Sequence, residues 1–200
     1  MAVISNGTTL IDNGALDSAV PTGKLTLIST QTASNSSTIS FTSGINSTYD
    51  VYVFKFIHIH PSYSSHDDFL FNLSTDSGSN YNVNKTGTYW SAINFENNSY
   101  ADIEYNSSLD HSSDTGFNHL TDNTGNDNDQ SLSGFFTLYE PSNTSRVTHY
   151  STRIENSEIA SSIDTFVSGY ANTTSAINGI QFKFQSGNIA SGLIKMYGVS

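Results

Sequence analysis

The sequence predicts an all-β protein, a two-sheet antiparallel sandwich of the jelly-roll kind with an extended N-terminal arm. Aromatic residues make up 12% of the 200 residues, and they favour strands over helices. Short apolar or alternating segments recur between clusters of turn-forming residues. No window of eleven residues carries the apolar spacing of an amphipathic helix. An open barrel is the competing arrangement.

The chain divides into an arm and one domain. Residues 1–23 hold few apolar side chains, three glycines and a proline, with no sustained period, so they are expected to be an extended arm. Residues 24–200 are expected to form the β-sandwich, because this length suits one sizeable domain.

Ten segments of the domain are expected to be strands because they are apolar or alternating and end in turn chemistry. They are residues 24–30, 37–42, 51–60, 67–75, 86–92, 134–140, 146–154, 164–171, 179–185 and 192–198. The segment EIASSIDTF, residues 158–166, comes nearest to a helical pattern and is expected to form at most one or two helical turns.

A long acidic segment, residues 94–131, separates the fifth and sixth expected strands. Loops of this length are uncommon in compact domains, so it either holds short strands of its own, such as ADIEY at 101–105, or is a functional excursion. No Lys or Arg occurs from residue 86 to residue 145. The segment is therefore expected to form the outermost surface.

Charge and composition argue against several classes of protein. Seven basic and 18 acidic residues give a net charge of −11, which would repel nucleic acid and anionic membranes. The absence of cysteine excludes disulfides, thiolate metal sites and a cysteine nucleophile. We expect no export signal and no membrane span, because neither a basic start nor a run of 18 apolar residues occurs.

The stretch FKFIHIHPSYSSHDDFLF, residues 54–71, concentrates three of the six histidines. His58 and His60 would share one strand face, and His66 with Asp67 could complete a metal shell. The alternative, which we favour, is a central strand with structural histidines, so no metal or other cofactor is predicted. A metal bound by the pair would be expected at a subunit interface. The shared face would comprise Tyr52, Phe54, Phe56, His58 and His60.

Residues 110–131 are rich in oxygen ligands suited to calcium, but Gly125 comes too early for an EF-hand loop and no Glu follows at the required distance. A solvated polar loop is the favoured interpretation. Nucleophile-elbow, zinc, phosphate-loop and dinucleotide motifs are absent from the sequence. Asp67 and Asp68 are adjacent and should point to opposite faces of a strand. We therefore predict no catalytic residue and no enzymatic activity.

Exposed aromatic residues are the remaining signal of function. Tyr81, Tyr89 and Trp90, the only tryptophan, lie among Asn and Thr residues, a surface typical of stacking on sugar rings. In the competing interpretation Tyr89 and Trp90 simply alternate, one entering the core and the other lying on the sheet surface.

Four stretches carry a resemblance to a known group of proteins. They are MAVISNGTTLIDNGAL, STISFTSGINSTYDVYVFKFIHIHP, NTGNDNDQSLSGFFTLYEPSNTSRVTHY and IQFKFQSGNIASGLIKMYGVS. Together they resemble virion proteins of tailed bacteriophages of marine bacteria, cyanobacterial phages especially. In that group an asparagine is expected where His58 stands, whereas His60 and Pro61 match.

The resemblance implies a virion structural protein, assembled in the host cytoplasm and exposed as a capsid decoration, head fibre or tail fibre. Its partners would be other virion proteins, bound through the arm, and it would form a homotrimer. The arm residues expected to make the anchoring contact are Ile4, Leu10, Ile11 and Leu16. The alternative is a carbohydrate-binding β-sandwich module that recognises a host-surface glycan.

Overall fold

The computed structural model describes residues 3–5, 7–12, 15–16 and 25–199, and none of these is helical. Each of the ten expected segments coincides with a strand, and every pairing between strands is antiparallel in the described chain. The all-β antiparallel sandwich is thus confirmed, while the jelly-roll connectivity stays a prediction.

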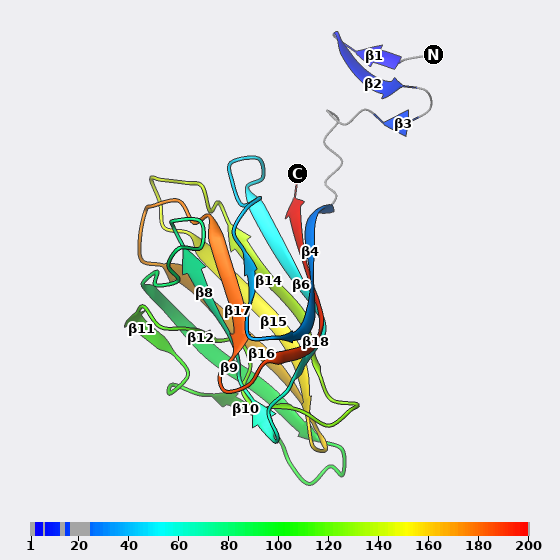
Figure 1. Cartoon of the computed structure of the whole chain (residues 1–200), viewed down its shortest axis with the longest axis vertical. Helices are drawn as coiled ribbons and strands as arrows, with labels where there is room; N and C mark the ends of the chain where they lie inside the picture. Colours follow the sequence, from blue (N-terminus) through cyan, green and yellow to red (C-terminus); the bar gives the residue numbers. More distant parts are fainter. Residues whose placement is uncertain (1–2, 6, 13–14, 17–24, 200) are drawn as a thin grey trace.

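One layer of the sandwich is a nine-stranded sheet (Figure 1). In spatial order its strands are β10 (Ala101–Tyr105), β9 (Lys85–Phe95), β16 (Ser161–Ala171), β15 (His149–Glu158), β14 (Leu132–Tyr139), β6 (Val51–Pro61), β18 (Ile189–Val199) and β4 (Leu25–Ser36), and β11 (His111–Asp114) also pairs with β9.

The second layer is a four-stranded sheet that lies over the middle of the large one (Figure 1). Its strands are β12 (Asn118–His119), β8 (Phe69–Ser74), β17 (Gly179–Phe184) and β5 (Ile39–Phe41). A two-stranded ribbon of β13 (Thr124–Gly125) and β7 (His66–Asp67) completes this part.

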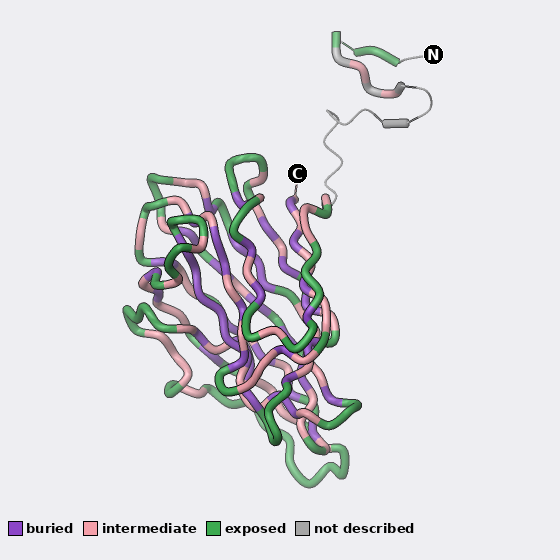
Figure 2. The backbone as a smooth tube through the Cα atoms, viewed as in Figure 1, coloured by how far each residue is buried: buried purple, intermediate pink, exposed green. Residues whose placement is uncertain are grey.

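Aromatic rings fill the space between the two layers, where the buried backbone of Figure 2 is concentrated. Phe182 of the small sheet lies 5.1 Å from Phe56 and 6.2 Å from Phe136 of the large sheet, ring centre to ring centre. Such edge-to-face contacts add stability beyond the area they bury. The sequence provides them by alternation, as in β15, where every second residue from Tyr150 to Asn156 is buried.

The two layers differ in what covers their outer faces. All six residues of β8 are buried, because loops lie over the outside of the small sheet. For instance, the side chain of Asn72 donates to the carbonyl oxygens of Tyr81 and Thr115 at 2.6 and 3.0 Å. The outer face of the large sheet has no such cover among the described residues, and most of its side chains are exposed or half-buried.

The acidic segment 94–131 holds short strands of its own, as one of the two expectations proposed. β10 coincides with ADIEY and is exposed throughout, and β11, β12 and β13 follow it. No helical turn forms at 158–166: β15 ends at Glu158, a tight turn follows with Ile159 at a positive φ of 44°, and β16 begins at Ser161. Cross-strand pairing outweighs a weak helical pattern here.

The predicted arm contains a separate three-stranded antiparallel sheet in its described part. Its strands are β1 (Val3–Ser5), β2 (Thr8–Asp12) and β3 (Ala15–Leu16), which pair only with one another among the described strands. The segment 17–24 and the side chains of Leu10 and Leu16 lie outside the described part of the chain. Division into arm and domain therefore stays a prediction.

Candidate functional site

Seven side chains form a continuous cross-strand row on the outer face of the large sheet. Each is the direct register partner of the next: Tyr105, Trp90, Phe166, Arg153, Phe135, Lys55 and Lys195, on β10, β9, β16, β15, β14, β6 and β18. We call these residues the outer row. Since neighbouring strands lie about 4.8 Å apart, six steps extend the row over about 29 Å.

Three of the four aromatic members of the outer row are open to solvent, and Phe166 is half-buried. Tyr105, Phe135 and Trp90 are 62%, 43% and 38% exposed, although large aromatic side chains usually lose most of their exposure on folding. The same alternation that sends Tyr89 and Phe136 into the core turns Trp90 and Phe135 outward. The row is thus a platform of ring surfaces without a covering layer.

The centre of the outer row is held rigidly. The rings of Trp90 and Phe166 stack at 4.1 Å with an interplanar angle of 3°. The guanidinium of Arg153 lies 5.3 Å from the centre of the Phe166 ring, on the side of the next strand. Arg153 in turn donates to both carboxylate oxygens of Asp164, at 2.7 Å from Nη2 and 3.1 Å from Nε. This bidentate pair fixes the guanidinium plane, so the platform is preorganised.

A shallow groove with a volume of about 370 Å³ opens beside the row between β14, β15 and β16. It combines ring surface, carboxylates and hydroxyls, and Ser162 Oγ donates to Glu155 Oε1 at 3.3 Å. Apolar surface with a few fixed polar groups is the usual composition of a small-ligand site. The lining residues are Ser133, Gly134, Phe135, Arg153, Glu155, Ser162 and Asp164.

Of the three aromatic residues predicted to contact a glycan, only Trp90 belongs to this face. Tyr89 is 1% exposed in the core, which confirms the competing interpretation that the pair alternates across the sheet. Tyr81 lies half-buried in the loop that covers β8 on the other layer, where its carbonyl accepts from Asn72. The three therefore do not form one surface.

Sequence reasoning missed the partners of Trp90, namely Tyr105, Phe166, Arg153 and Phe135. The sequence did contain a sign of them, because the aromatic residues of GFFTLYE, Phe135, Phe136 and Tyr139, alternate to both faces of a strand. A strand with rings on both faces is either buried on both or presents one set to a ligand or partner. Which strands lie side by side, and so which rings meet, depends on the sheet order.

The prediction that Tyr52, Phe54, Phe56, His58 and His60 share one face was wrong beyond Phe56. A β-bulge interrupts β6, since three residues of β14 (Leu132 to Gly134) face four of β6 (Ile59 to Phe56). His58 takes a positive φ of 47° at the bulge, and Ile59 enters the core.

Both histidines consequently line an outer hollow of about 470 Å³ with Asp129, Gln130 and Ser131. His60 Nδ1 contacts the Gln130 carbonyl oxygen at 2.7 Å, and His58 Nδ1 lies 3.3 Å from Ser131 Oγ. Within the described residues no group of three or more His, Cys, Asp or Glu side chains is placed to hold a metal ion. The two histidines thus serve to fix the start of β14 against the bulge.

Two aspartates of the calcium candidate, residues 110–131, are engaged by the protein itself. Asp110 accepts from the Tyr89 amide at 2.8 Å and from the Tyr105 hydroxyl. Asp114 accepts from the Gly116 amide at 2.9 Å and contacts His111 Nδ1 at 3.2 Å. These contacts hold this part of the acidic segment against β9.

A pair of half-buried aspartates connects the acidic segment to the small sheet. Asp68 lies 3.4 Å from His119 Nε2 and accepts from the Asn123 amide at 3.0 Å. Burial alone would raise the pKa of Asp68, but His119 and the amide outweigh it and lower that pKa. Burial, and then the neighbouring Asp68 charge, raise the pKa of Asp122 to about 6.

Lys85 is a buried cation on the inner face of β9. Its ammonium donates to Asn72 Oδ1, the Val83 carbonyl and the Gly116 carbonyl at 2.5, 2.8 and 3.0 Å. Burial lowers the pKa of Lys85 to about 8, although Asp114 opposes that change. The contacts tie three separate segments together, which points to a structural role.

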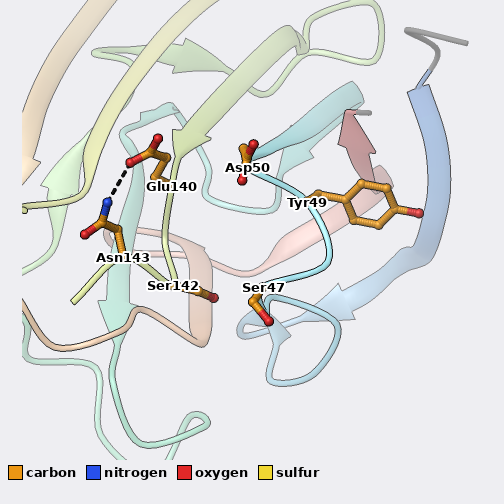
Figure 3. A pocket seen from close by; sticks show the side chains of 6 residues that line it. All are labelled: Ser47, Tyr49, Asp50, Glu140, Ser142 and Asn143. Carbon is orange, nitrogen blue, oxygen red and sulfur yellow. Dashed lines mark hydrogen bonds between the residues drawn. The ribbon is translucent and has the colours of Figure 1, made fainter. Parts of the chain in front are cut away.

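A smaller hollow of about 240 Å³ lies at one end of the sandwich, between the turns before β6 and after β14. Figure 3 shows the Glu140 carboxylate turned toward Asn143, whose amide donates to it at 2.7 Å, while the Tyr49 ring points the other way. Asp50 approaches the same turn through its carbonyl, which accepts from the Glu140 amide at 2.5 Å. The Glu140 carboxylate and the Asp50 carbonyl thus stabilise a turn.

The apolar residues predicted to anchor the arm lie on its small sheet. Ile4 is 61% exposed on β1, and Ile11 is half-buried on β2, where it pairs with Leu16 of β3 and Val3 of β1. Val3 is also exposed. Apolar side chains thus remain open on this sheet.

The comparisons with protein-family models, curated proteins and solved structures found no match to this chain. In the part of the chain that the structure describes, no helix has the length and apolar character needed to cross a membrane. The interpretation of the chain thus depends on its own residues and their geometry.

Proposed function

We propose that this chain is a non-enzymatic surface protein of a tailed-phage particle whose outer row binds a host-surface glycan. The observation that carries the binding activity is the row itself: aromatic side chains on neighbouring strands of an uncovered sheet face, with Tyr105, Trp90 and Phe135 exposed and with carboxylates and hydroxyls beside them.

A glycan suits this face better than the other common ligands. Sugar rings carry apolar C–H faces that stack on aromatic rings and hydroxyls that hydrogen-bond to carboxylates and serines. The groove supplies both, with Phe135 next to Glu155 and Ser162. A nucleic acid would meet a chain of net charge −11, which opposes binding of a phosphate backbone.

The same groups favour binding over hydrolysis. Asp164 is committed to the bidentate contact with Arg153, and this leaves Glu155 without a second free carboxylate across the groove. A glycosidase uses two carboxylates, one to protonate the leaving oxygen and one to attack or activate water. The groove is also shallow, so it does not exclude water from a reacting bond.

The binding proposal is tested with Trp90→Ala and Phe135→Ala, probed on a glycan array and by electrophoresis in gels that contain polysaccharides of the host surface. Wild type is expected to be retained, and each variant should lose tenfold or more in affinity. Tyr139→Ala is the matched control, because Tyr139 is 40% exposed on the same face but outside the row. Retention unaffected by either row variant contradicts the proposal.

Attachment to the particle is proposed to depend on the arm, with Ile4, Leu10, Ile11 and Leu16 contacting a capsid or tail protein. The exposed Val3 and Ile4 side chains support it, because an open apolar surface is typical of a binding site. Deleting residues 1–20 should abolish incorporation into particles and leave glycan binding intact. Incorporation that persists after the deletion refutes this anchoring.

The jelly-roll connectivity and the homotrimer belong to the same proposal. In a trimer the outer rows of three subunits would bind one glycan surface together, and linked binding sites gain avidity without new contacts. Light scattering should give three times the mass of one 21.7 kDa chain. A single-chain mass would remove the trimer from the proposal and leave the binding face unchanged.

A further inference from the structure

The outer row ends in two lysines that face each other across neighbouring strands. Lys55 of β6 and Lys195 of β18 are direct register partners, and both point outward because their strand neighbours Phe54, Phe56, Ile194 and Met196 are buried. Like charges placed directly opposite one another destabilise a sheet pair. The arrangement therefore has a cost that the fold itself does not explain.

No carboxylate of the described chain neutralises the lysine pair. Neither Lys55 nor Lys195 takes part in an ion pair there, whereas Arg153, two strands away, is paired with Asp164. Lys55 Nζ lies over the ring of Tyr197, 5.4 Å from its centre. A carboxylate or sulfate from outside would reach an unpaired double positive charge.

The location of the lysine pair is as unusual as its charge. The chain has only seven basic residues against 18 acidic ones, yet three of the seven lie in the outer row. Phe135, with its ring exposed, is the register partner of Lys55. A ring surface and two ammonium groups thus lie side by side at this end of the row.

We propose that Lys55 and Lys195 form an anion subsite, so that the glycan recognised by the outer row is an acidic saccharide. A sugar ring would stack on Phe135 while its carboxylate or sulfate accepts hydrogen bonds from the two ammonium groups. This inference rests on the proposed glycan-binding function and specifies the class of glycan.

The negative charge of the rest of the protein weakens its attraction for an acidic saccharide and limits that attraction to short distances from the lysine pair. A net charge of −11 opposes the approach of a dense polyanion, so attraction comes from the short-range contacts at the lysine pair. Binding should therefore favour saccharides with spaced anionic groups and weaken as salt is raised. Stacking on the aromatic end of the row should persist at high salt.

The test uses dextran and two charged derivatives of low and matched substitution, carboxymethyl dextran and dextran sulfate, which share one backbone and differ in the anionic group. Affinity is measured by electrophoresis in gels that contain each polymer. Wild type should bind both charged polymers at least tenfold more tightly than dextran, and the Lys55→Gln/Lys195→Gln variant should lose that preference. The ratio between the two charged polymers identifies carboxylate or sulfate as the preferred group.

The matched control is Arg146→Gln/Lys183→Gln, which removes the same charge from an exposed loop and from β17 of the other sheet. It should bind like wild type, because the effect is local. An equal loss in this control, or wild-type binding of dextran as tight as that of the charged polymers, overturns the anion subsite. In the second case the proposed glycan binding survives, provided that Trp90→Ala still abolishes it.

A complete failure is also distinguishable. Retention of none of the three polymers by wild type contradicts the acidic-saccharide inference. The glycan array with the Trp90→Ala variant then decides separately whether the outer row binds any glycan. Circular dichroism of each variant checks that the lysine substitutions leave the sheet intact, as expected for side chains that point away from the core.

Discussion

The two faces of the large sheet carry the same kinds of side chains with opposite consequences. On the inner face, Phe54, Phe136 and Tyr150 are closed off by the small sheet. On the outer face, Trp90 and Phe135 come from the same strands as buried rings and remain open. An aromatic residue of this sheet therefore stabilises the core or remains accessible to a ligand according to which face is covered.

The charged residues follow the same division. Lys85 points inward and is enclosed by carbonyl oxygens, which makes it a link between loops. Lys55 and Lys195 point outward and have no such partners among the described residues, which makes them available to a ligand. The type of side chain therefore does not decide whether a residue of this sheet is enclosed or accessible. That depends on whether the second sheet and its loops cover the face on which the residue lies.

The largest expected effect comes from neighbouring phenylalanines of β14. Phe136→Ala should lower the free energy of unfolding by about 3–5 kcal/mol, because the buried ring contacts Phe54, Phe71, Tyr150 and Phe182 and its loss leaves a cavity. Phe135→Ala should change it by less than about 1 kcal/mol. Urea denaturation measures both, and equal losses would mean that a partner subunit covers the outer face.

A smaller effect is expected from the lysines. Lys85→Met should cost on the order of 2–4 kcal/mol, because the buried carbonyls of Val83 and Gly116 would each lose their donor at about 1–3 kcal/mol. Lys55→Met, the outward counterpart on β6, should be close to neutral. A neutral result for Lys85→Met in the same urea experiment would show that water replaces the ammonium and that the interior is less closed than described.

The smallest effect concerns the half-buried aspartates at the rim of the interior. The pKa of Asp122 rises from an ordinary 3.8 to about 6 on folding, so the folded state binds more protons between these values. The stability that this proton contributes is present below about pH 4 and is lost as the pH rises through 6. The pKa of Asp68 is lowered instead, so its contribution is lost only as the pH falls below its ordinary value of 3.8.

Asp122→Asn should therefore melt at a higher temperature than wild type at pH 7.5 and at a similar temperature at pH 4.5. Thermal melts across this range measure the difference, and Asp102→Asn on the exposed strand β10 removes one charge as a control. A wild-type stability that does not vary from pH 4 to pH 7, or an equal response of the control, would contradict the coupling between Asp122 and Asp68.

The strands were predictable because their determinants are local. All ten main strands were expected from three local features: alternating or apolar segments, turn residues between them and the lack of a helical period. The alternation from Tyr150 to Asn156 in β15 is one example. The short strands β11, β12 and β13 could not be predicted, because two to four polar residues become strands only when a neighbour offers a partner edge. The turn at Ile159 was not expected either, because the spacing of apolar residues in EIASSIDTF partly matches that of a helix.

The candidate site was predictable only at Trp90. The signal was a tryptophan among polar residues, and alternation with Tyr89 indicated that one of the pair faces outward. Its partners Phe166, Arg153 and Phe135 lie 45 to 76 positions further along the chain, and their meeting depends on the order β9, β16, β15 and β14. The bulge at His58 was equally hidden, because one inserted residue reverses every later face of a strand.

The sequence by itself determined the class of this protein: strands, turns, an acidic surface and no cysteine chemistry. These follow from side-chain size, branching and charge, which act within a few residues. Only the tertiary structure decided which aromatic rings are core and which are open, and which charges are paired. The physical reason is that successive side chains of a strand point to opposite faces of the sheet. Which face is buried depends on a second layer that distant parts of the chain contribute.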